Sequence, residues 1–357
     1  MKNLLFISGT GRSGTTLLDK LLSCHPDMTV LSQPFPYLFI HAKKKFLSSL
    51  GYENEYNVLS NCFFEKRYTI SDLNDFLSKL LIKSGEIIEL FEQMQDYSGQ
   101  LTKLDDINTL KSRITDDLFI NQFKNLLYIM QKNKQSKYIG SKEIVCEEFF
   151  PFFVNNSVKC ILIIRDPRDV ITSLNFGDSE KYIGKHRPTL FNIQNWRKSV
   201  AFKIHLENNK NFAFIKYEDL VNDPLVTLNK VAEFLEIEKF NDDMLHTDWV
   251  GNSSFNQNYS GISQDSHGKY KELMPQEMIN YIEATCFPEM KHLGYDVNID
   301  TSNYEQYILS YKEPFSITRP EFEPNFSTSK PNLDREIQRI KQVSLKQDIR
   351  NFYEEKL

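Results

Sequence analysis

The sequence is poor in cysteine, and the cysteines that it has lie far apart. None of them forms a C-x-x-C pair, which excludes a disulfide framework or a zinc site of ordinary spacing and indicates reduced thiols. Long apolar runs are also missing. The first run, residues 4–8, is too short for a signal peptide or a membrane span. We therefore expect a cytoplasmic protein without a membrane span. The cysteines are Cys24, Cys62, Cys146, Cys160 and Cys286.

The sequence has no excess of positive charge. Its 43 lysines and arginines face 48 aspartates and glutamates, which gives a net charge of −5 at pH 7. Because nucleic-acid binding depends on basic surfaces, this balance argues against a nucleic-acid partner, although a local basic cleft stays open. Hydrophobic residues make up 40% of the 357 residues, enough for a real core in one large domain with additions or in two domains.

Short apolar runs that are typical of buried strands alternate with helical patterns. Continuous apolar strands that alternate with helices are typical of parallel sheets covered on both faces. The sequence therefore predicts an α/β fold with a central parallel sheet flanked by helices. The expected strands are residues 3–9, 137–141, 159–166 and 212–217, and the expected helices include residues 15–24, 169–175 and 224–235.

Two regions depart from this alternation. Residues 42–135 hold apolar residues at helical spacing, in one place after a capping pattern of Thr69 and Asp72. We expect a helical insertion above the sheet, inside a domain of residues 1–300. Residues 301–357 begin rich in proline and serine and continue as a charged helix from residue 332, which predicts a linker and a C-terminal helical extension.

The segment GTGRSGTT has the glycine spacing of a phosphate-binding loop, from Gly9 to Gly14, between an expected strand and an expected helix. Glycines let the backbone wrap around an anion, and the helix N-terminus adds a favourable dipole. Nucleotide kinases carry a lysine after the last glycine, but here Thr15 follows it and the cation is Arg12. The loop therefore suits a small anionic group bound without a metal. The alternative is a glycine-rich turn that only caps a helix.

A second motif, ILIIRDPRDVITSL, follows the expected strand 159–166. Asp166 and Asp169 are suited to cap the helix that starts here. Arg165 then emerges at the carboxyl end of the strand, where ligands bind in such sheets. With Ser173, it predicts a second phosphate site. The alternative is a solvated cluster of charges that pair with one another.

These motifs resemble those of the sulfotransferases that use 3′-phosphoadenosine 5′-phosphosulfate (PAPS). The first resembles their 5′-phosphosulfate loop, and the second resembles their 3′-phosphate motif. Further similar segments are IKYEDLVNDPLVTLNKVAEFL (215–235) and GNSSF…ISQDSHGKYKELM (251–274), so the resemblance covers about residues 3–296 apart from the insertion. It implies a P-loop-like fold, PAPS as the donor, no metal, and a hydroxyl-bearing acceptor beneath the insertion.

The resemblance also implies a role for individual residues. Tyr217 stands where a residue near the adenine is expected, with a core aromatic as the alternative. Lys269 stands where a closing loop supplies a basic residue to the 3′-phosphate, and Lys271 is its substitute. Arg165 and Ser173 are expected at that phosphate. The residues expected around the 5′-phosphosulfate are Gly11, Arg12, Ser13, Gly14, Thr15 and Thr16.

The catalytic base is the point where the resemblance weakens. Gln33 stands where related enzymes often carry a glutamate, and a neutral amide cannot accept a proton. Lys142 matches a lysine that relatives place near the sulfuryl group, and Glu143 follows it. We expect Arg12 and Lys142 to act on the sulfuryl group and Glu143 to be the base. Both can share one cleft only if the strand ends there, because adjacent strand residues point to opposite faces. Glu147 and Glu148 are expected to be solvated.

Two other functions stay open at this point. A P-loop nucleotide kinase would need Mg²⁺ and the missing lysine, and a non-catalytic nucleotide-binding protein would need no base. The acceptor is open as well. The 27 phenylalanines and 17 tyrosines indicate a partly apolar cavity, which suits a glycan, a glycolipid or a small hydroxylated metabolite. The sequence predicts no oligomeric state.

Overall fold

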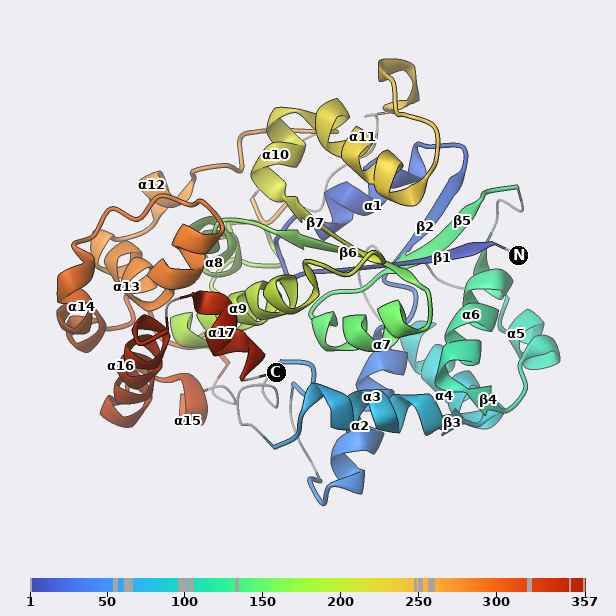
Figure 1. Cartoon of the computed structure of the whole chain (residues 1–357), viewed down its shortest axis with the longest axis horizontal. Helices are drawn as coiled ribbons and strands as arrows, with labels where there is room; N and C mark the ends of the chain where they lie inside the picture. Colours follow the sequence, from blue (N-terminus) through green and yellow to red (C-terminus); the bar gives the residue numbers. More distant parts are fainter. Residues whose placement is uncertain are drawn as a thin grey trace.

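Five parallel strands form the central sheet, in the order β2-β5-β1-β6-β7 (Figure 1). They are β1 (Asn3–Ser8), β2 (Met28–Ser32), β5 (Tyr138–Lys142), β6 (Lys159–Ile164) and β7 (Phe212–Lys216). The structure is a computed structural model. It describes residues 2–53, 57–60, 67–95, 102, 106–131, 135–246, 249, 253–255, 261–319, 323–346, 348–355 and 357.

The strands bury both of their faces, as the continuous apolar runs predict. Leu5 and Ile7 of β1 face one core, and Phe6 between them faces the other. On the first face lie α1 (Thr15–Ser23), α10 (Tyr217–Asn222) and α11 (Pro224–Leu235). On the second lie α7 (Phe150–Asn155) and α9 (Thr189–Leu206), as Figure 1 shows. The predicted α/β fold with a central parallel sheet is confirmed.

The insertion is helical and belongs to the core of the second face. It consists of α2 (Pro36–Ser49), α3 (Ile70–Lys79), α4 (Ser84–Gln95), α5 (Ile107–Arg113) and α6 (Phe119–Met130), with the two-stranded ribbon β3 (Leu81–Ile82) and β4 (Asp117–Leu118). Thr69 and Asp72 form the predicted capping box. The ring centroids of Phe6 and Phe153 lie 4.5 Å apart, and those of Phe123 and Phe153 lie 4.7 Å apart. The insertion and the sheet therefore share one aromatic core.

The C-terminal extension packs on α9 and on α13 (Gln276–His292) (Figure 1). The prediction of one charged helix from residue 332 is wrong, because α16 (Lys330–Ser344) and α17 (Ile349–Glu354) are separate. They follow α14 (Tyr304–Ser310) and α15 (Glu323–Phe326). Arg197 of α9 donates to both carboxylate oxygens of Glu336, once at 2.9 Å from Nη2 to Oε1. The backbone N–H of Ile70 donates to the carbonyl of Leu357 at 3.2 Å. The extension therefore contacts the sheet domain and the insertion.

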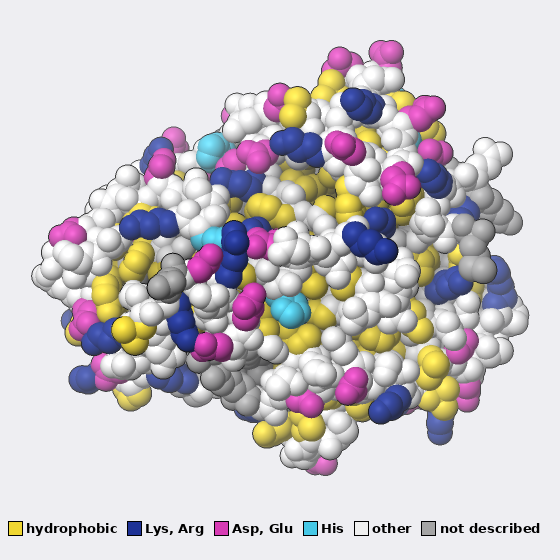
Figure 2. All heavy atoms as spheres, in the orientation of Figure 1, with side chains coloured by type: hydrophobic (Ala, Val, Ile, Leu, Met, Phe, Trp, Pro, Cys, Tyr) yellow, Lys and Arg dark blue, Asp and Glu magenta, His cyan; other side chains and the backbone are white. Residues whose placement is uncertain are grey.

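The surface carries charges of both signs. In Figure 2, lysine and arginine side chains are interspersed with aspartate and glutamate side chains. This matches the nearly even balance of charge in the sequence. Among the residues that the structure describes, no helix is both long enough and apolar enough to span a membrane.

Candidate functional site

Most of the candidate residues lie at the carboxyl edge of the sheet because they follow the end of a strand. The phosphate loop, residues 9–14, follows β1, and Glu143 follows β5. Arg165 follows β6, and Tyr217 follows β7. Gln33 follows β2. The parallel topology thus brings together segments that lie far apart in the sequence, from the phosphate loop at residues 9–14 to Tyr217, at the edge where such sheets bind ligands.

The phosphate loop takes a conformation that depends on Gly14. Its φ is +90°, and a Cβ atom there would lie 2.3 Å from Cδ2 of Tyr217. Arg12 also has a positive φ, 72°, which is uncommon for a residue other than glycine. The turn is closed by the N–H of Ser13, which donates to the carbonyl of Thr10 at 3.1 Å. The loop then passes directly into α1, so the N-terminus of α1 faces the pocket.

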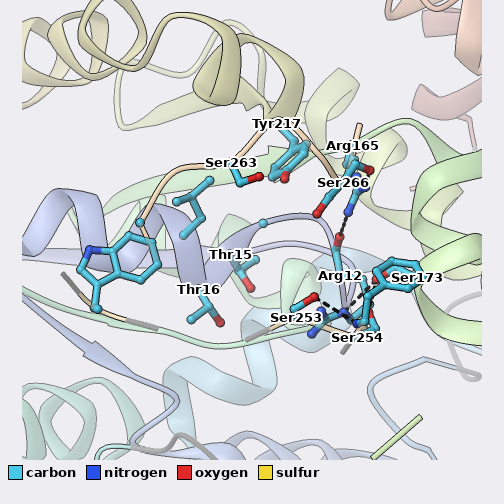
Figure 3. A pocket seen from close by; sticks show the side chains of 15 residues that line it. Arg12, Thr15, Thr16, Arg165, Ser173, Tyr217, Ser253, Ser254, Ser263 and Ser266 are labelled. Carbon is cyan, nitrogen blue, oxygen red and sulfur yellow. Dashed lines mark hydrogen bonds between the residues drawn. The ribbon is translucent and has the colours of Figure 1, made fainter. Parts of the chain in front are cut away.

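The loop forms one wall of a cavity of about 120 Å³, which we name the nucleotide pocket (Figure 3). The other walls come from Arg165 directly after β6, α8 (Pro167–Asn175), Tyr217 at the start of α10, and the segments around Trp249 and Ser266. Of the predicted donor-binding residues, those that line the pocket are Arg12, Gly14, Thr15, Thr16, Arg165, Ser173 and Tyr217.

Two guanidinium groups meet in this pocket. Arg12 donates from Nε to Oγ of Ser173 at 3.2 Å and from Nη1 to the hydroxyl of Tyr182 at 3.3 Å. Arg165 donates from Nη1 to the carbonyl of Arg12 at 3.2 Å and also bonds the carbonyl of Ser266. Figure 3 shows Arg165 beside the ring of Tyr217, and its Cζ lies 4.5 Å from the ring centroid. The two motifs are therefore joined by their own side chains.

The residues present fit an anionic donor. Among the described residues, Oγ of Ser13 and Nε of Arg165 are buried and have no hydrogen-bond partner, and such buried donors are unfavourable without an acceptor. Burial lowers the pKa of the Arg12 guanidinium, and the nearby Arg165 lowers it further, while Tyr182 opposes this shift. A phosphate or sulfate oxygen would relieve both conditions, because it accepts hydrogen bonds and neutralises the cations.

The segment after residue 261 closes over the second motif through Asp169. The backbone N–H groups of Gly268 and Tyr270 donate to the Asp169 carboxylate at 2.7 and 3.3 Å. The expectation that Asp169 caps the helix is therefore wrong; Asp166 alone does so, by accepting from the N–H of Arg168. The ammonium of Lys269 lies 4.0 Å from the ring centroid of Phe255, a residue of the nucleotide pocket.

Lys142 is the last residue of β5, and Glu143 follows the end of the strand. The Lys142 ammonium lies 3.3 Å from Oδ2 of Asp19 and donates to Oγ1 of Thr16 at 3.3 Å. It also donates to Oε1 of Gln33 at 3.5 Å. Lys142 does not itself line the nucleotide pocket as the described residues define it, but it contacts Thr16, which does.

Glu143 lies on the other side of the phosphate loop, in a larger cavity of about 400 Å³ that we name the Glu143 cavity. Its Oε1 accepts from the N–H of Phe35 at 2.8 Å. Burial raises the pKa of Glu143 to about 8, against the opposing effects of the Phe35 N–H and of Lys142. Thr10 and Gly11 also line this cavity. The loop thus separates a nucleotide pocket from a cavity that contains a carboxyl group.

Glu147 and Glu148 are buried, and the expectation that they are solvated is wrong. Glu147 forms an ion pair with Lys198 at 3.1 Å and accepts from Ser199 at 2.5 Å. The hydroxyl of Ser199 is 2.7 Å from that of Thr10, so this network supports the phosphate loop from behind. Glu148 pairs with Lys43 and accepts from Tyr68 at 2.7 Å.

Several residues of the site escaped the sequence analysis. Tyr182 and Asp19 have no motif of their own, and only their contacts with Arg12 and Lys142 reveal them. Trp249 lines the nucleotide pocket, and a single residue separates it from the GNSSF segment that follows. A tryptophan next to such a segment is a signal that could have been followed.

Comparison with known proteins finds sulfotransferases. The sulfotransferase domain family matches residues 2–294. Protein-tyrosine sulfotransferase A of Caenorhabditis elegans is 22% identical over 320 residues, which are 84% of this chain and 69% of that protein. Sulfotransferase 2B1 of Mus musculus is 26% identical over 114 residues, 29% of this chain and 34% of that protein.

Among solved structures, the sulfotransferase domain from the curacin biosynthetic pathway is similar, with a TM-score of 0.46 and 18% identity. The similarity covers 84% of this chain and 99% of that domain. The family match spans the phosphate loop, the Arg165 motif, Glu143 and the segment that closes on Asp169. The chain therefore belongs to the sulfotransferase family and is a sulfotransferase.

Proposed function

We propose that the chain transfers the sulfuryl group of PAPS across the phosphate loop to a hydroxyl of an acceptor in the Glu143 cavity. One observation carries the proposal: Gly11 lines the Glu143 cavity, and its neighbour Arg12 lines the nucleotide pocket. The loop that holds the sulfuryl group would then be the boundary between donor and acceptor. Such placement favours in-line attack, because both reactants are fixed before reaction.

The donor side of the proposal rests on the two arginines. Arg165 and Ser173 hold the 3′-phosphate, with Lys269 in support from the closing segment. Arg12, the loop amides and the N-terminus of α1 neutralise the oxygen that leaves from sulfur. Lys142 lies beside Thr16 and supplies positive charge behind the loop. A sulfuryl group carries less negative charge than a phosphoryl group, so this transfer needs no metal clamp.

The acceptor side rests on Glu143. The acceptor oxygen forms a bond to sulfur, and the bond from sulfur to the 5′-phosphate oxygen breaks. The acceptor proton moves to the Glu143 carboxylate, and 3′-phosphoadenosine 5′-phosphate leaves. Gln33 is an amide whose Oε1 accepts from Lys142, so it orients groups and takes no proton.

We also propose a cytoplasmic location. Support comes from the thiols, since Cys24, Cys146, Cys160 and Cys286 are free and the last three are buried; Cys62 lies outside the described residues. Free thiols are typical of reducing compartments. Fractionation of the source cells tests this location.

The experiment that tests the donor assignment compares two nucleotides. Arg165→Ala should weaken the binding of 3′-phosphoadenosine 5′-phosphate by about tenfold or more, because a charge-assisted hydrogen bond contributes about 1.5–3 kcal/mol. It should weaken the binding of AMP much less, since AMP lacks the 3′-phosphate. Calorimetry measures both affinities, and the exposed Arg335→Ala is the control. Equal losses for the two nucleotides would refute the assignment.

Transfer itself is tested with labelled PAPS and a panel of hydroxyl compounds in the presence of EDTA. The proposal expects labelled product and a rate that added Mg²⁺ does not raise. A requirement for Mg²⁺ would contradict the metal-free mechanism. Donor binding without transfer to any acceptor would favour the non-catalytic alternative.

A further inference from the structure

The Glu143 cavity has an acidic inner end and a basic outer end. Glu143 is buried, whereas the other charged residues that line the cavity reach the surface. Lys44 and Arg319 are exposed, and Arg187 is half-buried. Apolar side chains, among them Ile40 and Leu174, make up much of the rest of the lining, together with polar ones such as Asn192. The cavity therefore combines apolar surface with a buried carboxyl group and three cations nearer to solvent.

One of these cations comes from outside the family domain. Arg319 lies beyond residue 294, where the family match ends. Its segment is held in place by paired contacts with His186. The N–H of His186 donates to Oγ1 of Thr318 at 2.8 Å, and the N–H of Thr318 donates to the carbonyl of His186 at 3.1 Å. The His186 ring also stacks on Phe315, with 4.4 Å between centroids.

The same segment is tied to the start of α9. Glu313 accepts from the N–H of Thr189 at 2.7 Å and from its hydroxyl at 2.8 Å. The N-terminal part of α9 lines the cavity with Phe191 and Asn192. Residues 313–319, which we call the strap, are thus bound beside the cavity at both ends, by Glu313 and by Thr318. These contacts position Arg319 in the cavity lining.

The net charge of the lining favours an anionic ligand. The described lining residues include three cations and a single acid, and that acid is buried whereas the cations reach the surface. A volume of about 400 Å³ is that of a small-molecule site. Apolar walls favour an apolar body, and a cluster of Arg and Lys favours a carboxylate, which arginine binds with two parallel hydrogen bonds.

We propose that the acceptor is a small amphipathic hydroxy acid whose hydroxyl reaches Glu143 and whose carboxylate is bound by Lys44, Arg187 and Arg319. This inference rests on the proposed function and names the substrate class of that site. It also assigns the C-terminal extension a role in specificity, through Arg319. The apolar body lies along Ile40 and Leu174, between the two polar ends.

The experiment uses three matched probes with labelled PAPS and the full chain: ω-hydroxydodecanoate, its methyl ester, and dodecanol. We expect KM for the hydroxy acid to be about tenfold lower than for the two neutral probes, with similar kcat. Arg319→Ala and Arg187→Ala should each remove about threefold or more of this preference, and Arg319→Lys should restore part of it. Lys312→Ala, an exposed change directly before the strap 313–319, is the control and should leave the preference intact.

A binding measurement separates this inference from the proposed function. Calorimetry with 3′-phosphoadenosine 5′-phosphate present should detect binding of ω-hydroxydodecanoate even if no probe is sulfated. Arg319→Ala should weaken this binding. Loss of transfer with retained binding therefore counts against the proposed function alone. Equal KM values for charged and neutral probes would overturn the substrate class. So would sulfation of tyrosine peptides by a chain that neither binds nor sulfates the hydroxy acid.

Discussion

At the scale of single residues, Glu143 combines complete burial with a place beside the phosphate loop. Burial raises its pKa to about 8, so its carboxylate form gains population as the pH rises toward that value. A general base acts only in its deprotonated form. The protonation of this one side chain would therefore set the pH dependence of transfer.

We predict that the single-turnover rate of sulfuryl transfer rises with pH and levels off above about pH 8. Glu143→Gln should lower the plateau by a factor of about 10²–10⁴ and flatten the profile. Rapid-quench measurements with donor and acceptor saturating would check this. If Glu143→Gln keeps the parental rate while Lys142→Ala loses it, the base assignment is wrong and the role of the lysine survives.

The same shift predicts an effect on stability that does not depend on turnover. The pKa of Glu143 is raised from 4.5 to about 8 on folding. Its neutral form therefore contributes stability that is fully present below about 4.5 and is lost as the pH rises through about 8. The melting temperature of the parent should fall relative to Glu143→Gln between about pH 5 and pH 9. A constant difference between the two proteins would contradict the buried, titrating carboxyl.

The sequence could predict which residues gather at the sheet edge, but not how neighbours divide between pockets. Arg12, Arg165 and Tyr217 follow strand ends in recognisable motifs, and they do line one pocket. Lys142 and Glu143 are adjacent, and the sequence leaves open whether they share one cleft, which requires the strand to end before Glu143. The strand does end at Lys142, yet Lys142 contacts Thr16 whereas Glu143 lines the other cavity, which only the folded backbone reveals.

At the scale of elements, the phosphate loop packs closely against Tyr217 at the start of α10. Gly14 is required here for two reasons: its φ is positive, and the ring of Tyr217 occupies the place that a Cβ atom would take. By contrast, a Cβ atom on Gly11 would meet no described atom within 4 Å.

We predict that Gly14→Ala displaces Tyr217 and abolishes tight binding of 3′-phosphoadenosine 5′-phosphate. It should also lower stability by about 1–3 kcal/mol, the range for a strained backbone position. Gly11→Ala is the matched control and should leave the melting temperature nearly unchanged. Calorimetry and thermal unfolding would measure the two effects. A Gly14→Ala protein as stable as the Gly11→Ala protein would show that the loop can rearrange.

Helix α9 illustrates why some elements elude sequence analysis. It is buried on nearly all sides, so it has no polar stripe, and the expected helices did not include it. Its buried polar groups have partners: the Trp196 ring N–H donates to the carbonyl of Arg165 at 2.8 Å, and Lys198 forms an ion pair with Glu147. Periodicity detects half-buried helices, whereas a central helix is recognised only from its partners. The short edge strand β2 was missed for a different reason, since five residues give little pattern.

At the scale of the whole molecule, a buried ionic cluster joins the extension to the domain. Glu336 of α16 takes both hydrogen bonds of Arg197. Arg339 pairs with Glu289 at 2.6 Å, and the hydroxyl of Tyr353 donates to Glu289 at 2.7 Å. Burial opposes ionisation of Glu336, but Arg197 outweighs it, and the pKa of Glu336 falls to about 2.

We predict that Glu336→Gln destabilises the protein by about 3–5 kcal/mol, because it leaves the Arg197 cation buried without its partner. Asp334→Asn is the control on the same helix, since its exposed pair with Lys330 should contribute less than about 1 kcal/mol. Urea unfolding measures both. Because the folded pKa is depressed from 4.5, this contribution is present above about 4.5 and is lost as the pH falls toward 2. Equal effects of the two substitutions would mean that the cluster does not hold the extension.

The phosphate loop divides the active centre so that no described residue lines both the nucleotide pocket and the Glu143 cavity. One side is built from strand ends and the segments around Trp249 and Ser266. The other takes Lys44 from the insertion and Arg319 from the extension. In the proposed function, the acceptor side therefore draws on segments added to the sheet domain, whereas the described lining of the donor side does not. Substitution of Lys44 or Arg319 should change the acceptor preference and leave donor affinity unaltered.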